Sequence, residues 1–498
     1  MCIRDRGRNA PSPQRRHLHI GTHHRTTKYL PDISSEGLCE QAEPLKKLDS
    51  LSAPVDAGRA RDGQRAGPVA LARIWRLFGE SFWVVAGQAA VALGALVMIR
   101  FLTGLLPPAV FSELTLGTTI ATFIQVIFLG PLGASAARYY SIATEQKDLQ
   151  SFLTSVRRLI SYVAVILCII LLFGTIALDF FGSGRWISLV VFTFLFGLFT
   201  GTGGVLASIQ NSARNRRNYA LHSAAETWLR LLLCWSLACW LGPTSANVML
   251  GWTLAALLVM VSHALFLKRS FSHITSTTSP LVWNSELLRY SLPFAAWGCL
   301  HWAQSSADRW ALHFYDTKEN VGAYGVLSQI GSSSMAQLFS IGLQIAGPIV
   351  FSRAVTRTNR TQTCSASGLS WRLTALTVVA TAILFMIASR FHVEIFQILV
   401  ADEYHVFSHY FPWLIGTGGI FAASQVLALD ILSKLEQVRL LFLRVGNYVF
   451  GTLLSVLGAY FFGVAGVVGA GFVSSLSMLV SVAVLSWYLS MTSDKAKA

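Results

Sequence analysis

Residues 159–181 read LISYVAVILCIILLFGTIALDFF, an almost unbroken apolar run. A helix of about 20 such residues crosses the roughly 30 Å hydrocarbon core of a membrane. Eleven further apolar stretches lie along the chain, so we expect twelve membrane-spanning helices, with an error of a few residues at each end. The expected spans are 81–101, 111–130, 159–181, 186–209, 224–241, 246–267, 291–314, 321–351, 370–389, 406–432, 440–462 and 463–489.

The composition agrees with a membrane protein. Hydrophobic residues make up 53% of the chain and charged residues 13%, against roughly 25% charged residues in a soluble domain. The mean hydropathy is +0.53. These values exclude a soluble fold. The net charge of +15 does not indicate nucleic-acid binding, because the basic residues are dispersed over loops and do not gather on one module.

Basic residues predict the topology. After Arg76 the chain has 25 Lys and Arg residues, of which 18 fall in alternate loops and only three in the opposite loops, namely Arg185, Lys318 and Arg390. Because basic residues next to spans stay in the cytoplasm, both termini are expected to be cytoplasmic. Four more basic residues lie within or at the edge of spans: Arg100, Arg230, Arg309 and Arg444.

The chain is expected to have five parts. Residues 1–70 are polar and rich in Arg, Pro, Ser and Gly, which predicts a disordered basic tail. Its opening Met1-Cys2-Ile3-Arg4-Asp5-Arg6 resembles a sequencing-adapter scar, so part of the tail can be foreign to the natural protein. The remaining parts are an N-terminal six-helix lobe at 71–270, a cytoplasmic linker at 271–288, a C-terminal six-helix lobe at 289–490 and a cytoplasmic tail at 491–498.

The two lobes repeat one another. Arg100-Phe-Leu-Thr leads through a short loop into Val110-Phe-Ser-Glu-Leu, and Arg309-Trp-Ala-Leu leads likewise into Val321-Gly-Ala-Tyr-Gly. Later in each half, a Gly-led link joins Gly242 to Gly251-Trp-Thr-Leu and Gly463 to Gly471-Phe-Val-Ser. Six spans per half give both halves the same orientation, related by an axis along the membrane normal. We therefore expect two parallel six-helix lobes around a central cavity.

Several chemical motifs are missing. The chain contains no Gly-Lys dipeptide and hence no phosphate-binding loop, no HExxH motif and no Cys pair with metal-ligand spacing among its seven cysteines. We expect no ATP hydrolysis by that loop, no metal and no cofactor. The chain is predicted to be a secondary transporter, not an enzyme.

A polar strip in the seventh span is the candidate substrate site. His301, Gln304, Ser305 and Asp308 are spaced i, i+3, i+4 and i+7, which places them on one helical face beside Arg309. A charge costs about 2.5–3.5 kcal/mol at the centre of a membrane helix, so this face is expected to line a cavity.

The first span adds Arg100, at the matching place in the repeat, and Gln88. Two guanidiniums in one space suit a phosphate-bearing headgroup, because a planar guanidinium bonds phosphate oxygens in pairs. The charged residues and the glutamines can also have purely structural roles. Asp308 and Arg309, like Arg100, can sit at the membrane interface, and glutamines such as Gln88 can simply pack helices together.

The chain resembles the multidrug/oligosaccharidyl-lipid/polysaccharide (MOP) exporter superfamily, and within it the Wzx-type polysaccharide flippases. The resemblance covers residues 71–490. It is carried by the opening Leu77-Phe-Gly-Glu-Ser-Phe-Trp-Val-Val-Ala-Gly-Gln88, by Asp308-Arg309 followed by Val321-Gly-Ala-Tyr324, and by the closing Gly463-Val-Ala-Gly-Val-Val-Gly-Ala-Gly471.

This resemblance implies a two-lobed helical bundle in the bacterial cytoplasmic (inner) membrane. Such a protein moves polyprenyl-pyrophosphate-linked glycans across the membrane by alternating access, with cationic cavity residues on the pyrophosphate and the polyprenyl tail in lipid. It implies membrane lipids and polysaccharide polymerase machinery as further partners, and leaves H+ or Na+ coupling open. The chain shows no thirteenth and fourteenth spans after residue 489, which argues against the lipid II flippase branch.

Two other functions stay open. A drug/cation antiporter of the MATE branch would need acidic cavity residues, and the spans contain few: Asp179, Asp308, Asp430 and Glu226. A polytopic glycosyltransferase or glycan polymerase would place its catalytic groups in an outside loop. The only loop of that kind, at 390–405, is short and carries His392, Glu394, Asp402, Glu403 and His405.

Overall fold

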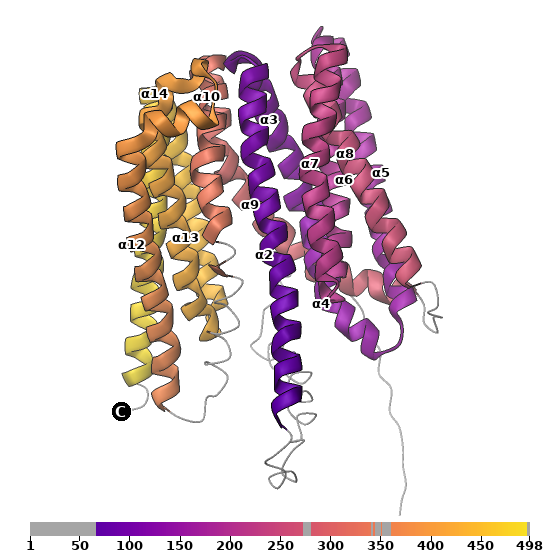
Figure 1. The fold of residues 1–498 in the computed structure, drawn as a ribbon, viewed down its shortest axis with the longest axis vertical. Helices are drawn as coiled ribbons and strands as arrows, with labels where there is room; N and C mark the ends of the chain where they lie inside the picture. The colour runs from indigo at the N-terminus through magenta and orange to yellow at the C-terminus, as the bar shows by residue number, and fades with distance from the viewer. Residues whose placement is uncertain (1–65, 272–279, 340–341, 344–349, 351–359, 496–498) are drawn as a thin grey trace, which may run out of the picture. The chain divides into compact units, whose positions relative to one another are not determined.

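The computed structural model describes residues 66–271, 280–339, 342–343, 350 and 360–495. Within these ranges the chain is helical apart from short turns, and no strand occurs there. Residues Ile74–Ala498 form one compact unit. Its helices run side by side, as Figure 1 shows. The all-helical membrane fold expected from the sequence is confirmed.

The first half of this unit runs from α2 to α8. Its elements are α2 (Ala66–Leu105), α3 (Pro108–Ile124), the π-helical segment η3 (Gln125–Leu129), α4 (Gly130–Glu145), α5 (Leu149–Phe180), the short 3-10 helix η4 (Gly184–Trp186), α6 (Ile187–Ser212), α7 (Arg216–Leu241) and α8 (Ser245–Ser270). Pro108 occupies the first position of α3, where its missing N–H is no loss. Within this half, α6 packs against α3, α4 and α8, and α7 packs against α8.

The second half runs from α9 to α14. Its elements are α9 (Pro280–Tyr315), α10 (Lys318–Ser328), the π-helical segment η5 (Gln329–Ser333), α12 (Arg360–Leu399), the 3-10 helix η6 (Asp402–Tyr410), α13 (Phe411–Ser433) and α14 (Gln437–Lys495). Gly463 divides α14 into two helices, because its φ of +55° is not helical. A Cβ at Gly463 would lie 2.6 Å from Oδ2 of Asp316, so this bend favours glycine.

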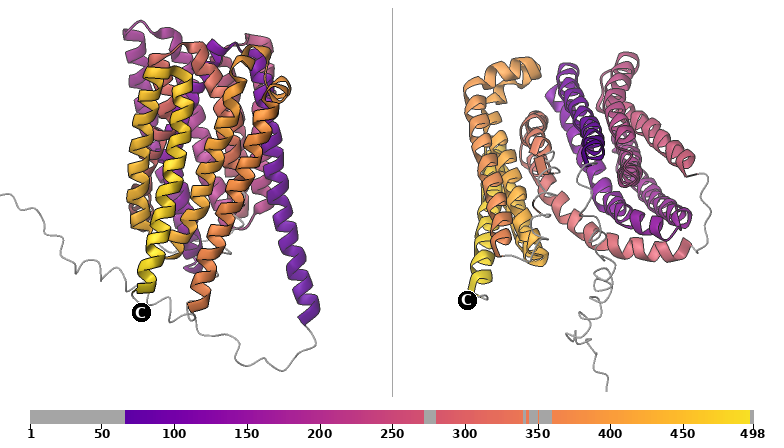
Figure 2. Two further views of the ribbon diagram at one scale, coloured as in Figure 1. Left: turned by 90° about the vertical axis from the view of Figure 1, so that its left-hand side faces the viewer. Right: turned by 60° about the horizontal axis from the view of Figure 1, so that its bottom comes forward.

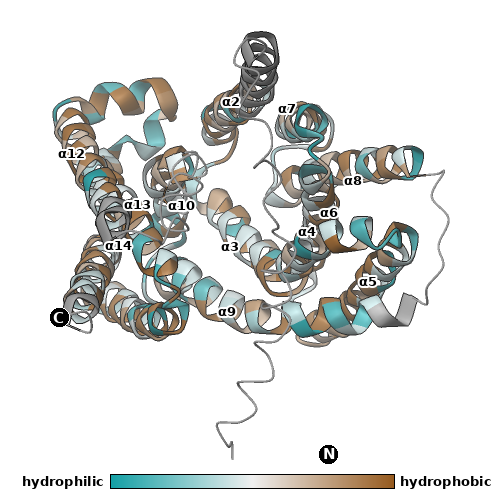
Figure 3. Ribbon diagram, turned by 90° about the horizontal axis from the view of Figure 1, so that it is seen from below, coloured by the Kyte–Doolittle hydropathy of each residue, from teal (hydrophilic) through white to brown (hydrophobic). Residues whose placement is uncertain are grey.

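Each of the twelve expected spans falls on helical segments, although some run over two or three of them, two share α14, and only part of the span at 321–351 is described. Among the described residues, eight helical segments are long and apolar enough to cross a membrane, which makes this a multi-pass membrane protein. Helices α7 and α9 are not among the eight, because polar and charged residues together lower the hydropathy of their sequences. The ribbon of α9 in Figure 3 accordingly alternates between hydrophilic and hydrophobic colours. The count of twelve therefore stays a prediction.

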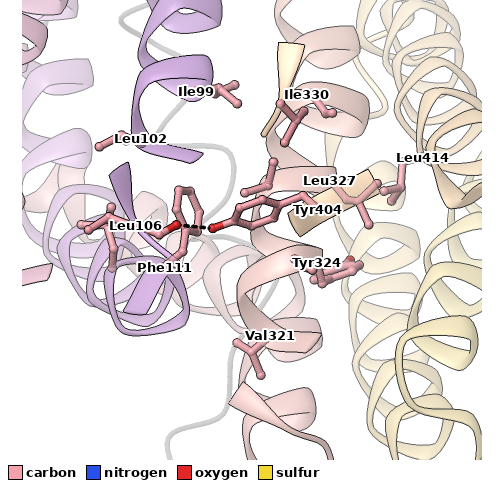
Figure 4. Close-up of a cluster of buried hydrophobic side chains, with 14 of the residues drawn as sticks. Ile99, Leu102, Leu106, Phe111, Val321, Tyr324, Leu327, Ile330, Tyr404 and Leu414 are labelled. Atoms are coloured by element: carbon pink, nitrogen blue, oxygen red, sulfur yellow. Dashed lines mark hydrogen bonds between the residues drawn. The ribbon is translucent and has the colours of Figure 1, made fainter. Parts of the chain in front are cut away.

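One end of the bundle is closed by contacts between the two halves, and we call it the sealed end. There α3 packs along α10, so closely that a Cβ on Gly322 would overlap the carbonyl oxygen of Pro108. The hydroxyl of Tyr404 in η6 donates a 2.8 Å hydrogen bond to Leu106 O, and its ring meets Phe111 edge-on at 6.1 Å. These residues belong to one apolar cluster from both halves, which Figure 4 shows.

The opposite end, where α14 ends, has two separate apolar clusters. One joins α4, α5 and α6 to the start of α9, where Trp283 Nε1–H donates a 2.7 Å hydrogen bond to Asp148 Oδ2. The other joins α13 to α14. Figure 2 shows α14 ending at this end of the unit. We call this the terminal end.

The helix bounds bear on the parts expected from the sequence. Helix α2 begins at Ala66, α9 begins at Pro280 inside the expected linker, and α14 continues to Lys495 inside the expected tail. Residues 1–65 lie outside the described residues. Helix α9 packs against α14 in its own half and against α4 and α5 in the other. The assignment of 71–270 and 289–490 to two lobes stays a prediction.

Candidate functional site

A cavity of about 780 Å³, which we call the central cavity, lies between the two halves. Its wall includes residues of α2, α3, α6, α7 and α8 from the first half and of α9, α10, α13 and α14 from the second. Serine and threonine hydroxyls are frequent on this wall, together with the glutamines Gln125, Gln304, Gln329 and Gln337. A polar space inside an otherwise apolar bundle can hydrogen-bond a polar ligand.

Arg309 lies on the wall of the central cavity. Its guanidinium donates hydrogen bonds to Ser305 O at 3.2 Å and to Ser328 Oγ at 3.0 Å. Among the described residues it forms no ion pair. A guanidinium that meets only neutral acceptors keeps its full positive charge and is attractive to an anion.

Asp308 lies beside Arg309 on the same wall but has its own partner. Its Oδ2 accepts a 2.6 Å hydrogen bond from the hydroxyl of Tyr324 on α10. Its Oδ1 accepts a 2.8 Å bond from the backbone N–H of Arg309. The carboxylate is therefore held by two donors, and it orients the end of α9 against α10.

His301 and Gln304 also lie on the cavity wall. The ring of His301 packs against that of Tyr448 on α14 at 5.6 Å, and its Nδ1 is buried without a hydrogen-bond partner. The structure thus places every member of the strip expected in the seventh span, from His301 to Arg309, on one cavity. Their role in binding stays a prediction.

Arg100 does not lie on this wall. Its guanidinium donates a hydrogen bond to the carbonyl of Val400, at the junction of α12 and η6. Next to it, Thr103 Oγ1 accepts a 3.2 Å bond from the backbone N–H of Ala401. The expectation that Arg100 and Arg309 share one central space is therefore not met, and Arg100 instead joins the two halves at the sealed end.

Gln88 is also placed elsewhere. It is half-buried on α2, next to Gly87, whose backbone approaches Ala220 of α7. Gln88 lines neither the central cavity nor the second cavity described below.

One residue of a charged pair that the sequence argument did not select also lines this cavity. Arg230 of α7 lies on the wall of the central cavity and forms an ion pair with Glu226, one turn earlier on the same helix. The i, i+4 spacing of the two residues inside a span was the available signal. The structure thus supplies a second cavity arginine, but from α7 and not from α2.

Two π-helical segments meet the central cavity at matching places in the two halves. η3 begins at Gln125 after α3, and η5 begins at Gln329 after α10. Both glutamines line the cavity. A π-helical turn shifts the direction of the following side chains, and such turns are frequent at functional sites. The repeat inferred from sequence thus extends to local backbone geometry.

A second cavity, of about 570 Å³, adjoins the first and is called here the side cavity. It lies within the first half and against α9, and it shares Gln125, Thr200 and His301 with the central cavity. Its wall is rich in glycine, and Gly203 and Gly204 have no neighbouring atoms where a Cβ would stand. Glu226 also faces this space.

The segment considered for catalysis is folded against its neighbours. His392 Nδ1 lies 3.1 Å from Ser408 Oγ, and His405 Nε2 lies 3.3 Å from Val400 O. Asp402 lies 3.7 Å from His405. Among the residues that the structure describes, no three His, Cys, Asp or Glu side chains gather in a way that could hold a metal ion.

Comparison with known families decides the classification. Residues 78–352 match the model of the family described as polysaccharide biosynthesis protein. The chain belongs to this family. The match covers the whole wall of the central cavity except the residues from α13 and α14. No curated protein sequence matches the chain.

Solved structures with the same fold agree with this family. Lipid II flippase MurJ in an inward closed conformation is 13% identical, with a TM-score of 0.61 over 81% of this chain and 86% of that chain. A multidrug resistance MATE family transporter of the MOP superfamily in an inward-facing conformation is 14% identical, with a TM-score of 0.54 over 82% of this chain and 96% of that chain. The eukaryotic MATE transporter AtDTX14 is 15% identical, with a TM-score of 0.51 over 82% of this chain and 93% of that chain. The fold that the resemblance to the MOP superfamily implied is therefore confirmed.

Proposed function

We propose that the protein is a secondary transporter for polyprenyl-pyrophosphate-linked glycans. It moves them from the inner to the outer leaflet of the bacterial cytoplasmic membrane by alternating access. Its termini lie in the cytoplasm, so the terminal end faces inward and the sealed end outward. The family and the shared fold support a transporter of lipid-linked precursors, and the cavity chemistry supports the pyrophosphate link.

Arg309 is the observation on which this proposal rests. Its guanidinium lines a cavity between the two halves and donates its hydrogen bonds to neutral acceptors. Phosphate oxygens accept two parallel hydrogen bonds from such a group. A drug cation would be repelled by it.

The remaining cavity wall suits a glycan. Sugar hydroxyls both donate and accept hydrogen bonds, as do the serine and threonine hydroxyls and the glutamine amides of the wall. The glycine-rich side cavity adds space next to this wall without adding bulk. The polyprenyl tail has no need of a protein site, because lipid accommodates it.

Alternating access requires one end to close while the other opens. At the sealed end the Tyr404–Leu106 hydrogen bond and the closely packed α3–α10 pair join the two halves. At the terminal end one apolar cluster joins the first half to the start of α9 and another joins α13 to α14, and the two clusters are separate. We infer that the terminal end admits substrate and that these sealed-end contacts break when substrate leaves.

Cation antiport has less support. Among the described residues of the central cavity wall, Asp308 is the one acidic side chain, and two hydrogen bonds already satisfy it. A site for a drug cation would need a carboxylate free to meet it. H+ or Na+ can still drive transport of an anionic substrate, and imposed gradients test this point.

Transfer of a fluorescent undecaprenyl-pyrophosphate oligosaccharide between leaflets of proteoliposomes tests the proposal. The purified full chain is compared with Arg309→Ala and with Arg309→Lys at equal insertion. Hydrogen bonds to charged groups contribute about 1.5–3 kcal/mol, so Arg309→Ala is expected to slow transfer roughly 10- to 100-fold. Arg309→Lys keeps the charge but loses the planar fork, and it is expected to fall between the two.

Arg439→Ala is the matched control. Arg439 is exposed, pairs with Glu436 at 3.5 Å on α14 and lies on neither cavity. Its removal is expected to leave transfer unchanged. Transfer that is equally fast in Arg309→Ala would remove Arg309 from the site. Wild-type protein that transfers no glycan of a varied set, under imposed proton and sodium gradients, would overturn the function.

A further inference from the structure

The ion pair of α7 lies at a corner of the central cavity, where Arg230 lines the wall while Glu226 lines the side cavity. Arg230 and Glu226 are i, i+4 neighbours whose side chains are only 23–26% exposed. The guanidinium carbon of Arg230 lies 4.7 Å from the centre of the Phe196 ring, which in turn lies 5.8 Å from the ring of Trp252. Arg230, Phe196 and Trp252 all line the cavity. The corner is therefore a charged group held among aromatic rings.

Hydrogen-bond donors in this corner are incompletely used. Glu226 contacts only Nη2 of Arg230, and Nη2 also reaches Thr200 Oγ1 at a long 3.4 Å. Nε of Arg230 and Nε1 of Trp252 are both buried without a hydrogen-bond partner. Unpartnered buried donors are rare and unfavourable. The guanidinium thus lacks the two-point contact that it makes with a well-placed oxyanion.

Glu226 balances the positive charge of Arg230 at the edge of the central cavity. Arg230 and Arg309 bring two positive charges to the central cavity, and Asp308 and Glu226 bring two negative charges to its wall or edge. A lone guanidinium in this corner would be unfavourable without a counter-charge. An anionic ligand supplies the same counter-charge, so Glu226 and the ligand compete for one partner.

We propose that Arg230 is a second anion-binding residue of the central cavity and that the ligand's pyrophosphate takes the place of Glu226 on it. This inference rests on the proposed function for the source of the anion. The displaced carboxylate turns into the side cavity, which Glu226 already lines. Arg230 from α7 and Arg309 from α9 then hold the headgroup from the two halves of the bundle.

Binding of farnesyl pyrophosphate to the full chain in nanodiscs tests the exchange. Arg230→Ala is expected to weaken binding roughly 10- to 100-fold, as does the loss of any charged hydrogen bond. Glu226→Gln removes the competitor and is expected to tighten binding severalfold. This gain is decisive, because an ion pair that only stabilises the fold would give weaker or unchanged binding when Glu226 is altered.

Two controls keep the result interpretable. Glu436→Gln and Arg439→Ala alter the exposed pair on α14 and are expected to leave the affinity unchanged. If Arg230→Ala does not fold, Arg230→Lys takes its place, and it is expected to bind more weakly than wild type because it lacks the fork. Unchanged affinity in both Glu226→Gln and the folded Arg230 variant would overturn the exchange, as would weaker binding by Glu226→Gln.

Competition by inorganic pyrophosphate identifies the source of the anion. A much weaker competitor than unlabelled farnesyl pyrophosphate indicates a lipid headgroup, whereas an equal competitor indicates a free anion; each outcome supports the anion site. Failure of the exchange is distinguishable from failure of the proposed function. If only the exchange fails, wild type binds farnesyl pyrophosphate and Arg309→Ala does not, while the α7 variants bind it as wild type does. If the proposed function fails, wild type neither binds farnesyl pyrophosphate nor transfers the lipid-linked glycan.

Discussion

Two acid–base pairs with the same i, i+4 spacing lie on different helices of this bundle. Asp430 and Lys434 of α13 are in contact at 2.8 Å, and the side chain of Asp430 is fully buried. Asp430 also accepts bonds from Ser367 of α12 at 2.5 Å and Ser486 of α14 at 2.7 Å. Lys434 donates a further 2.9 Å bond to Ser490. This pair ties three helices together and leaves neither partner short of a bond.

The pair Glu226–Arg230 on α7 differs in each of these respects. Both side chains are about one-quarter exposed, the contact uses one amino group, and Nε of Arg230 has no partner. Both residues face cavities. A charge inside a membrane helix is thus no evidence of function by itself. The satisfaction of its hydrogen bonds and its access to a cavity separate a structural pair from an exchangeable one.

The largest expected effect is on the pair of α13. Asp430→Ala leaves Lys434, whose side chain is 16% exposed, without its counter-charge. Loss of one partner of a buried pair costs about 3–5 kcal/mol. We expect a large fall in the melting temperature of the purified protein in detergent. A melting temperature close to that of wild type would show that the α13 pair is not structural. The proposed difference between this pair and Glu226–Arg230 would then be wrong.

Replacing both Asp430 and Lys434 by apolar residues tests whether the loss of stability comes from the unpaired charge. The double variant Asp430→Leu with Lys434→Met removes both charges and keeps the volume, which is often neutral or stabilising for buried pairs. We expect it to recover most of the stability that Asp430→Ala loses. Ser367 and Ser486 lose their acceptor, so full recovery is not expected. Melting curves of the single and double variants, recorded side by side, measure the recovery.

A smaller effect is expected for the pair of α7. Glu226→Gln removes a partly exposed contact, and such contacts contribute about 0.2–1 kcal/mol. The melting temperature should change little, although the affinity for farnesyl pyrophosphate should rise. A loss of stability as large as that of Asp430→Ala would place Glu226–Arg230 in the structural class.

The smallest effect is expected for Glu436 and Arg439 on α14. This pair is 37–54% exposed and 3.5 Å apart. Arg439→Ala should change the free energy of unfolding by no more than about 0.5 kcal/mol. A greater change, measured by the same melting curves, would show that exposure is a poor guide to the importance of a pair in this protein.

The sequence predicted the spans well for a physical reason. Membrane helices must satisfy their backbone hydrogen bonds within one apolar run, so length and hydropathy indicate them directly. The i, i+3, i+4, i+7 spacing likewise placed His301, Gln304 and Asp308 on one face, and the structure puts all three on the central cavity. Periodicity within one helix is thus a reliable local rule.

Arg100 marks the limit of such rules. The repeat suggested that it matches Arg309, but Arg100 lies seven residues before the N-cap of α3, at Pro107, and Arg309 lies eight before the N-cap of α10, at Thr317. One residue rotates a helix position by about 100°. The two arginines therefore point in different directions. Hydrogen-bond partners from other helices, such as Val400 for Arg100, could not be identified from spacing.

The most direct test of this account compares two lipids in the same wild-type proteoliposomes. One is a polyprenyl-pyrophosphate-linked oligosaccharide, and the other carries the same glycan on the same prenyl chain without phosphate. If arginines in the central cavity hold the headgroup, the pyrophosphate lipid is transferred between leaflets and the phosphate-free lipid is transferred at least roughly tenfold more slowly. Equal rates for the two lipids would contradict an anion-binding cavity.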